Sequence, residues 1–225
     1  MQIEEELELE GTKPEIIPAT ANESNLGKYE DACANFDWQS VEQSFSWSTT
    51  GKVNMAYEAI DRHALGAKAD KVALYYSDAA RDEQYTFTEM KRQSDKFGNV
   101  LRKLGVAKGD RVFIFMPRTP ELYFALFGIL KVGAVAGPLF EAFMETAVKD
   151  RLQDSGAVAI VTTPALLSRV PASELPELKH IILVGETEQL ALGQVNYYEE
   201  MEKASDSLEI EWVDREDGMI IHYTS

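Results

Sequence analysis

Two short segments stand where a parallel sheet would place its binding loops. Met116-Pro117-Arg118 follows an apolar run over residues 111–116, and Phe140-Glu141-Ala142-Phe143 follows another over residues 134–139. Continuous apolar runs of this length are typical of strands buried on both faces. Ligands bind beyond the carboxyl ends of such strands. Both segments are therefore candidate binding loops, and the alternative is that they are ordinary connections.

The trio Asp61-Arg62-His63 is a second candidate, because carboxylates and imidazoles serve in acid–base catalysis. The same trio could instead hold a helix end in place through hydrogen bonds. A metal site is not expected. The chain has one cysteine, Cys33, and its three histidines, His63, His180 and His222, are scattered along the sequence.

The two candidate loops belong to one predicted strand–helix–strand unit over residues 111–140. Thr119-Pro120-Glu121 has the composition of a helix start, with a hydroxyl at the N-cap, a proline at the first helical position and an acid in the first turn. Residues 122–132 are apolar almost all round, and Gly133 can end the helix. Such a unit implies parallel strands joined by a right-handed crossover.

The elements around this unit follow from local patterns. We expect helices over residues 55–67, 86–104, 145–154, 164–168 and 197–204, the second of them starting with a capping box at Thr86 and Glu89. We expect a hairpin of residues 72–76 and 84–87, strands over 157–162, 179–185 and 219–223, and a surface loop over 186–194. The alternation beyond residue 110 predicts a doubly wound, mostly parallel α/β sheet with flanking helices.

The composition fits a globular protein, with 45% apolar and 27% charged residues among 225. The net charge of −16 argues against nucleic acid as the main partner, because phosphate backbones require clustered lysine and arginine. No apolar run is long enough to span a bilayer, and the N-terminus lacks the regions of a secretory signal. With a single cysteine, these features predict a cytoplasmic protein without a membrane partner, and they leave its oligomeric state open.

Three parts are predicted along the chain. Residues 1–28 are expected to form a disordered acidic leader, because glutamates crowd there without an apolar period. Residues 29–70 are expected to form an aromatic-rich N-terminal extension with a helix. Residues 71–225 are expected to form the first portion of the α/β domain.

Several motifs occur in the order and at the spacing of one enzyme family. One group resembles the N-terminal signature of the acetyl-CoA synthetases: Phe45-Ser46-Trp47, Gly51-Lys52-Val53-Asn54, Tyr57 and Asp61-Arg62-His63. A second group resembles the wider acyl-adenylate-forming (ANL) superfamily: Tyr85-Thr86-Phe87-Thr88-Glu89-Met90, Gly109-Asp110-Arg111-Val112, Met116-Pro117, Pro120-Glu121, Lys131-Val132-Gly133-Ala134-Val135 and Tyr223-Thr224-Ser225. The resemblance covers residues 29–225 and points to the AMP-forming acetyl-CoA synthetases.

This resemblance implies a ligase that joins acetate to ATP, giving acetyl-adenylate and pyrophosphate, after which the thiol of coenzyme A displaces AMP. It implies ATP, coenzyme A and Mg²⁺ as cofactors, and acetate, ATP and coenzyme A as small-molecule partners. In the family, most of the catalytic groups come after the phosphate loop. We therefore expect the 225-residue chain to be an N-terminal fragment that is inactive by itself, with no catalytic residue and no metal ligand of its own.

The resemblance also assigns candidate site residues. Thr224 and Ser225 match the start of the ATP phosphate loop. Phe140, Glu141, Ala142 and Phe143 match a loop near the coenzyme A tunnel that often reads Phe-Gly-Gly-Phe in relatives, so Glu141 and Ala142 put close backbone approach in question. Arg169 lies near the position where relatives hold the coenzyme A nucleotide, and Arg151 is a second possible contact. For both arginines, the alternative is a solvated surface charge.

Other functions stay open at this stage. The acid could be propionate or another short acid, because the acyl pocket of the family lies beyond residue 225. The chain could also be a non-catalytic module that binds coenzyme A or a partner protein. A structural domain without activity is the third possibility.

Overall fold

The structure is a computed structural model that describes residues 27–224. The predicted leader of residues 1–28 lies outside this range except for its last two residues, and Ser225 lies outside it as well. The chain divides into two compact units, Met1–Ser44 and Phe45–Ser225. The division into three parts predicted from the sequence stays a prediction.

The first unit contains two short helices, α1 (Tyr29–Ala34) and α2 (Trp38–Gln43). The Asp37 carboxylate caps α2 by accepting a hydrogen bond of 2.8 Å from the backbone N–H of Ser40. Such a cap pairs one of the donors that every helix start leaves open.

The second unit begins with short helical segments: α3 (Trp47–Thr50), the π-helix η1 (Tyr57–Asp61) and α4 (Arg62–Ala64). The helix predicted over residues 55–67 is therefore present, but its middle is wound as a π-helix. An antiparallel hairpin of β1 (Val72–Ser77) and β2 (Asp82–Thr86) follows, as predicted.

The long helix α5 (Phe87–Lys103) begins at the predicted capping box. The Thr86 hydroxyl accepts from the backbone N–H of Glu89 at 3.2 Å, and the Glu89 carboxylate accepts from the N–H of Thr86 at 2.8 Å. The helix ends before Gly105, whose φ of 81° lies in the left-handed region that favours glycine.

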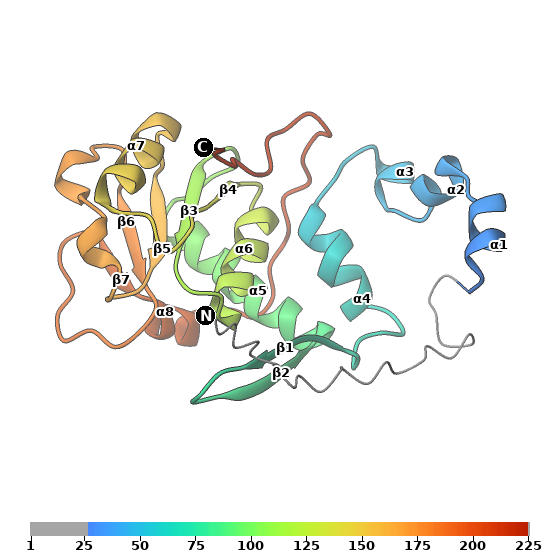
Figure 1. The fold of residues 1–225 in the computed structure, drawn as a ribbon, viewed down its shortest axis with the longest axis horizontal. Helices are drawn as coiled ribbons and strands as arrows, with labels where there is room; N and C mark the ends of the chain where they lie inside the picture. The colour runs from blue at the N-terminus through green and yellow to red at the C-terminus, as the bar shows by residue number, and fades with distance from the viewer. Residues whose placement is uncertain (1–26, 225) are drawn as a thin grey trace, which may run out of the picture. The chain divides into compact units, whose positions relative to one another are not determined.

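Five parallel strands form the central sheet in the order β4-β3-β5-β6-β7. They are β3 (Arg111–Phe115), β4 (Val135–Pro138), β5 (Ala159–Thr162), β6 (His180–Leu183) and β7 (Gln194–Asn196), and Figure 1 labels all five. The chain runs from β3 outward to β4 and then crosses to β5 on the other side of β3. The strand order therefore reverses at β3.

Helices cover both faces of this sheet. One core joins the sheet to α5, to α6 (Pro120–Lys131) and to α8 (Tyr197–Lys203). The second core joins the opposite face to α7 (Glu145–Ser155) and to the 3-10 turns η2 (Leu167–Arg169) and η3 (Ala172–Glu174). Neighbouring residues of β3 alternate between the two cores, with Val112 and Ile114 in the first and Phe113 and Phe115 in the second. The predicted doubly wound α/β fold is confirmed.

Several local predictions were wrong in detail. The helix predicted over residues 164–168 is a turn followed by the 3-10 turn η2. The strand predicted over residues 219–223 is reduced to one parallel bridge, between Ile220 and Ala136. The surface loop predicted to end at residue 194 gives way there to β7, which completes the sheet edge beside β6. Thr119 occupies the N-cap of α6, but its hydroxyl makes no capping hydrogen bond.

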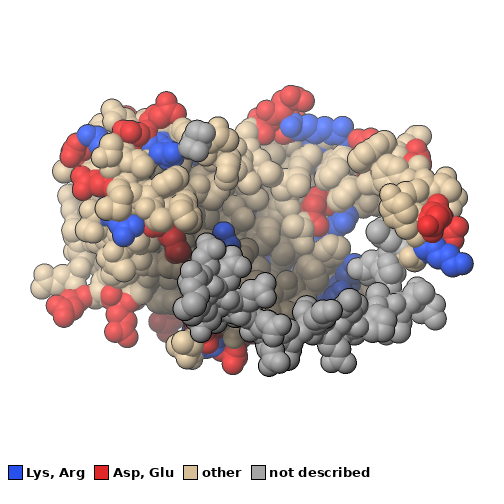
Figure 2. All heavy atoms as spheres, viewed as in Figure 1, with Lys and Arg blue, Asp and Glu red and all other residues tan. Residues whose placement is uncertain are grey.

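The surface reflects the charge balance of the sequence. On the face that Figure 2 shows, the described lysine and arginine side chains are dispersed among aspartate and glutamate side chains. Among residues 27–224, no helix has the length and apolar character needed to cross a bilayer.

Candidate binding site at the carboxyl edge of the sheet

The loop that follows β4 forms one wall of the candidate site. Its base is fixed to the neighbouring strand, because the N–H of Leu139 donates to the carbonyl oxygen of Ile114 at 2.8 Å. The loop then turns tightly, and the N–H of Phe143 donates to the carbonyl oxygen of Phe140 at 3.0 Å. The two rings meet edge to face with centroids 5.9 Å apart, and Phe140 stays 61% exposed. The loop thus presents an aromatic surface at the carboxyl edge.

Glu141 and Ala142 fit this loop without backbone strain. Neither residue has a positive φ, so the loop does not use the conformations that only glycine adopts easily. Both residues are exposed at the tip of the turn. The Glu-Ala pair therefore changes what the loop presents to a ligand, and the loop backbone itself is of an ordinary kind.

Arg169, on η2, holds the loop from a distant part of the chain. Its Nη1 donates to the carbonyl oxygens of Glu141 at 2.9 Å and Phe143 at 3.3 Å. These bonds attach η2, which follows β5, to the loop that follows β4. The family resemblance predicted that Arg169 lies near the coenzyme A nucleotide, which stays a prediction; in the structure its side chain supports the loop backbone.

Arg151, on α7, packs against the same loop. Its guanidinium carbon lies 4.4 Å from the ring centroid of Phe143 and 5.5 Å from that of Tyr223. Its Nη1 donates to the carbonyl oxygen of Ala147 at 2.9 Å. A cation over aromatic faces is a favourable contact. The loop and the C-terminal segment thus meet at one arginine.

Tyr223 brings the C-terminal segment to this site. Its hydroxyl donates to the Asp154 carboxylate at 2.7 Å and lies 3.3 Å from the carbonyl oxygen of Arg151. Burial, and then the hydrogen bond to Asp154, raises the pKa of the Tyr223 phenol, which therefore stays protonated at neutral pH. Thr224 follows directly and is exposed, and Ser225 lies outside the described residues. Sequence reasoning missed Tyr223 as a contact residue, although the Tyr-Thr-Ser motif contains it.

The site carries positive charge although the chain is strongly acidic. Within residues 27–224, neither Arg151 nor Arg169 forms an ion pair with a carboxylate, and both bind carbonyl oxygens or rings instead. Two guanidinium groups at one edge that form no ion pair could bind an anionic ligand.

The other predicted loop contributes less. Met116 is buried under the sheet edge, whereas Pro117 and Arg118 are exposed. Nothing in the described part of the chain forms a hydrogen bond or an ion pair with the Arg118 side chain.

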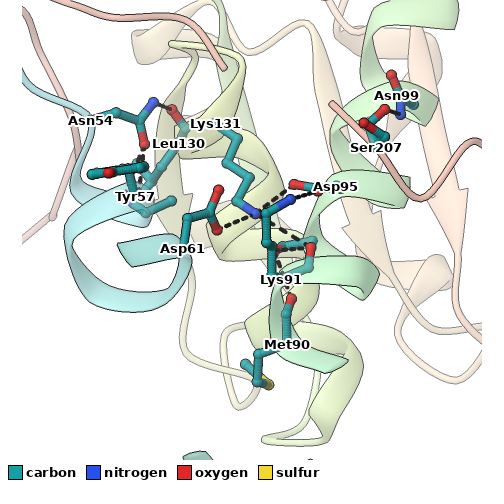
Figure 3. Close-up of polar contacts among 12 residues, drawn as sticks. Asn54, Tyr57, Asp61, Met90, Lys91, Asp95, Asn99, Leu130, Lys131 and Ser207 are labelled. Carbon is teal, nitrogen blue, oxygen red and sulfur yellow. Dashed lines mark hydrogen bonds and ion pairs between the residues drawn. The ribbon is translucent and has the colours of Figure 1, made fainter. Parts of the chain in front are cut away.

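Of the trio Asp61-Arg62-His63, Asp61 belongs to a buried structural cluster. The Nζ of Lys131 lies 2.6 Å from Asp61 Oδ1 and 2.6 Å from Asp95 Oδ1, and Figure 3 shows the three side chains converging. His63 instead packs against the ring of Phe87 with centroids 5.0 Å apart. The structure therefore favours the structural interpretation of the trio over acid–base catalysis.

A separate cavity of about 440 Å³ lies near the start of β4, away from the carboxyl edge. Its lining includes Trp47, Asn54, Met55, Leu130 and Met219. The Nδ2 and Oδ1 atoms of Asn54 already form hydrogen bonds with the backbone, so the amide is not available to a ligand. Among the described residues, no group of three histidine, cysteine, aspartate or glutamate side chains could hold a metal ion.

Comparison with known proteins finds similar chains among enzymes that form coenzyme A thioesters. An acetyl-coenzyme A synthetase of Bacillus subtilis is 56% identical over 210 residues, which cover 93% of this chain and 37% of that protein. A 3-hydroxypropionyl-coenzyme A synthetase of Sulfurisphaera tokodaii is 36% identical over 137 residues, covering 60% of this chain and 20% of that protein. The crystal structure of a Brucella canis acyl-CoA synthetase superposes with a TM-score of 0.77 at 29% identity, covering 88% of this chain and 36% of that one.

The chain thus spans just over a third of the length of the Bacillus subtilis protein. The profile of one protein family, described as AMP-binding enzyme, matches residues 60–225. That match includes all five strands of the central sheet and every described residue of the candidate site. The chain belongs to the AMP-binding enzyme family.

Proposed function

We propose that the protein containing this chain is an AMP-forming acetate–CoA ligase. The observation that carries this proposal is the 56% identity to the Bacillus subtilis acetyl-coenzyme A synthetase over 93% of the chain. The cationic, aromatic edge of the sheet supports it, because ATP and coenzyme A both present phosphates and a purine ring.

The proposed reaction has two steps. A carboxylate oxygen of acetate attacks the α-phosphorus of ATP, the bond to the bridging oxygen breaks, and pyrophosphate leaves. The thiolate sulfur of coenzyme A then attacks the acyl carbon of acetyl-adenylate, and AMP leaves with the electrons of the acyl–oxygen bond. Adenylation is needed because a free carboxylate is a poor electrophile, and the protein contributes chiefly by positioning the groups and by stabilising phosphate charge.

Within this chain we assign the two loops to different ligands. Thr224 and Ser225 would start the loop that binds the ATP phosphates through hydroxyl and N–H groups. Phe140, Glu141, Ala142 and Phe143 would border coenzyme A, with Arg169 supplying positive charge beside them. Arg151 would act on the same region through its contact with Phe143.

Mg²⁺ would enter as part of the ATP complex, since its ligands in nucleotide sites are largely phosphate oxygens and water. The candidate site has hydroxyl and guanidinium groups, which suit phosphates better than a bare cation. We propose a cytoplasmic location, in line with the single free cysteine, Cys33.

Another short acid is the second candidate substrate. The 36% identity to a 3-hydroxypropionyl-coenzyme A synthetase favours a test of that acid together with propionate. The residues described here border the nucleotide and coenzyme A regions, so they do not select between acids.

The deciding experiment is acid-dependent exchange of labelled pyrophosphate into ATP, measured on the protein at its full encoded length. Acetate, propionate, 3-hydroxypropionate and a long-chain acid are compared at equal concentrations. We expect the greatest exchange with acetate. A preference for 3-hydroxypropionate would move the second candidate forward, and no exchange with any short acid would refute the ligase proposal.

A further inference from the structure

We propose that Arg151 and Tyr223 are positioning residues that lock the Phe140–Phe143 loop to the segment ending at Thr224. This inference rests on the proposed function for its meaning, since that function assigns the two segments to coenzyme A and to ATP. The inference means that a substitution at Tyr223 should alter the stability of the Phe140–Phe143 loop, because the Arg151 side chain contacts both.

The first link joins α7 to the loop. The Arg151 guanidinium carbon lies 4.4 Å from the Phe143 ring centroid, close enough for a strong cation–π contact. Phe143 is also the residue whose backbone closes the loop, because its N–H donates to Phe140 and its carbonyl accepts from Arg169. A shift of the Phe143 ring would therefore move the whole turn.

The second link joins α7 to the C-terminal segment. Tyr223 shares the Arg151 guanidinium with Phe143, and its hydroxyl binds Asp154 one helical turn further along α7. Only one residue separates Tyr223 from Ser225. The orientation of Tyr223 thus helps to set the position of Thr224, the last described residue of the segment.

The contacts of the Arg151 side chain fit a residue that connects the two segments. No carboxylate in the described chain pairs with it, and its Nε is buried with no hydrogen-bond partner there. Its Nη1 is occupied by the carbonyl oxygen of Ala147. The two rings and the Ala147 carbonyl oxygen together hold the guanidinium, so displacing either ring weakens the contact with the other.

Amide hydrogen exchange of the full-length protein without ligands tests the coupling directly. The reporter is the Phe143 amide, which is hydrogen-bonded within the loop. Tyr223→Phe removes the bond to Asp154 and keeps the ring, and we expect the reporter to exchange about fivefold faster. The matched control is Tyr76→Phe, which removes a phenol bound to Asp78 in the distant hairpin and should leave the reporter unchanged.

Variants of Arg151 test whether the coupling passes through this side chain. Arg151→Met should speed exchange at both Phe143 and Tyr223, whereas Arg151→Lys keeps a cation and should give a smaller change at both. Unchanged Phe143 exchange in Tyr223→Phe and in Arg151→Met would overturn the coupling. Lys149→Met, on the same helix but paired with Glu174, is the control for helix stability.

Kinetics then separate the coupling from the proposed function. In the full-length protein, Tyr223→Phe should raise the KM for coenzyme A in thioester formation from supplied acetyl-adenylate, by about threefold to tenfold for a lost hydrogen bond. A purely structural role would lower the amount of active protein and leave this KM unchanged, which would contradict the proposal. Coupled exchange in a protein without activity toward any short acid would refute the ligase function and leave the coupling standing.

Discussion

The ammonium group of Lys131 lies 2.6 Å from the Asp95 carboxylate, and neither side chain is exposed to solvent. Asp61 binds the same ammonium group from η1, so three helical segments meet at one buried cation (Figure 3). The charge is balanced within the cluster, because Lys91 also pairs with Asp95. Burial is costly for each of these charges unless its partners remain in place.

Replacing Lys131 by methionine should therefore destabilise the fold strongly. Lys131→Met leaves Asp61 and Asp95 facing each other in a dry interior, and we expect the free energy of unfolding to fall by about 3–5 kcal/mol. Urea unfolding of the purified chain measures the change. Lys103→Met, which removes an exposed cation paired with Glu200, is the control and should change little. Equal effects of the two variants would contradict a structural role for the buried cluster.

The cost of Lys131→Met should also depend on pH. Burial raises the pKa of Asp61 above the ordinary range of an aspartate, even with Lys131 present. A raised native pKa means that this carboxyl contributes most to stability below its unfolded pKa and loses that contribution as pH rises. Without Lys131 the pKa of Asp61 rises further. The loss in free energy of unfolding relative to wild type should therefore be small near pH 4 and large at pH 7. Unfolding series at both pH values test this, and a deficit independent of pH would refute it.

Asn54 should be another sensitive position. Its Nδ2 donates to the carbonyl oxygens of Leu130 and Glu211 at 3.0 and 2.9 Å, and its Oδ1 accepts from two backbone N–H groups at the start of η1. Asn54→Ala leaves these buried groups unpaired, and we expect a loss of about 3 kcal/mol. Asn99→Ala is the matched control, because Asn99 binds two carbonyl oxygens that water can reach. Thermal unfolding of both variants should show the larger shift for Asn54→Ala.

Local patterns predicted most of the fold, because the signals lie close together in sequence. Thr86 and Glu89 are three residues apart, and their capping box fixed the start of α5 in advance. β7 was missed because it has three residues and owes its existence to pairing with β6. The π-helical winding of η1 has no recognisable pattern in the local sequence.

The sequence proposed the residues of the candidate site, but it did not indicate the contacts between them. The family resemblance proposed the loop, Arg169 and, as a second possible contact, Arg151, but it gave no sign that Arg169 reaches Glu141 across 28 residues of chain. Nothing local indicates which carbonyl a distant guanidinium will bind. Lys131 did carry a signal, since a lysine within an apolar helix must find buried partners, but its partners lie on other helices.

The crossing of α5 and α6 gives a prediction about packing. A Cβ atom added at Gly128 would lie 2.8 Å from Phe97 Cδ1 and 3.0 Å from the backbone nitrogen of Gly98. Alanine favours helices more than glycine, but this overlap is with backbone and a buried ring, so Gly128→Ala should destabilise by about 1–3 kcal/mol. Arg92→Ala, at an exposed position of α5, should have little effect on the same urea unfolding curve. A stabilised Gly128→Ala variant would show that the two helices can separate at low cost.

Arg169 offers the sharpest test of the assigned coenzyme A region. Arg169→Ala removes two hydrogen bonds to the loop and a positive charge, so the KM for coenzyme A should rise by about tenfold or more, while the KM for ATP in pyrophosphate exchange changes less. Arg169→Lys keeps the charge but not the geometry that spans two carbonyl oxygens. Recovery by lysine would assign the effect to charge on the ligand, and failure to recover would assign it to the support of the loop. Arg102→Ala, which removes a guanidinium bound to the carbonyl oxygen of Glu209, controls for general effects. Equal rises in both KM values would place Arg169 outside a dedicated coenzyme A region.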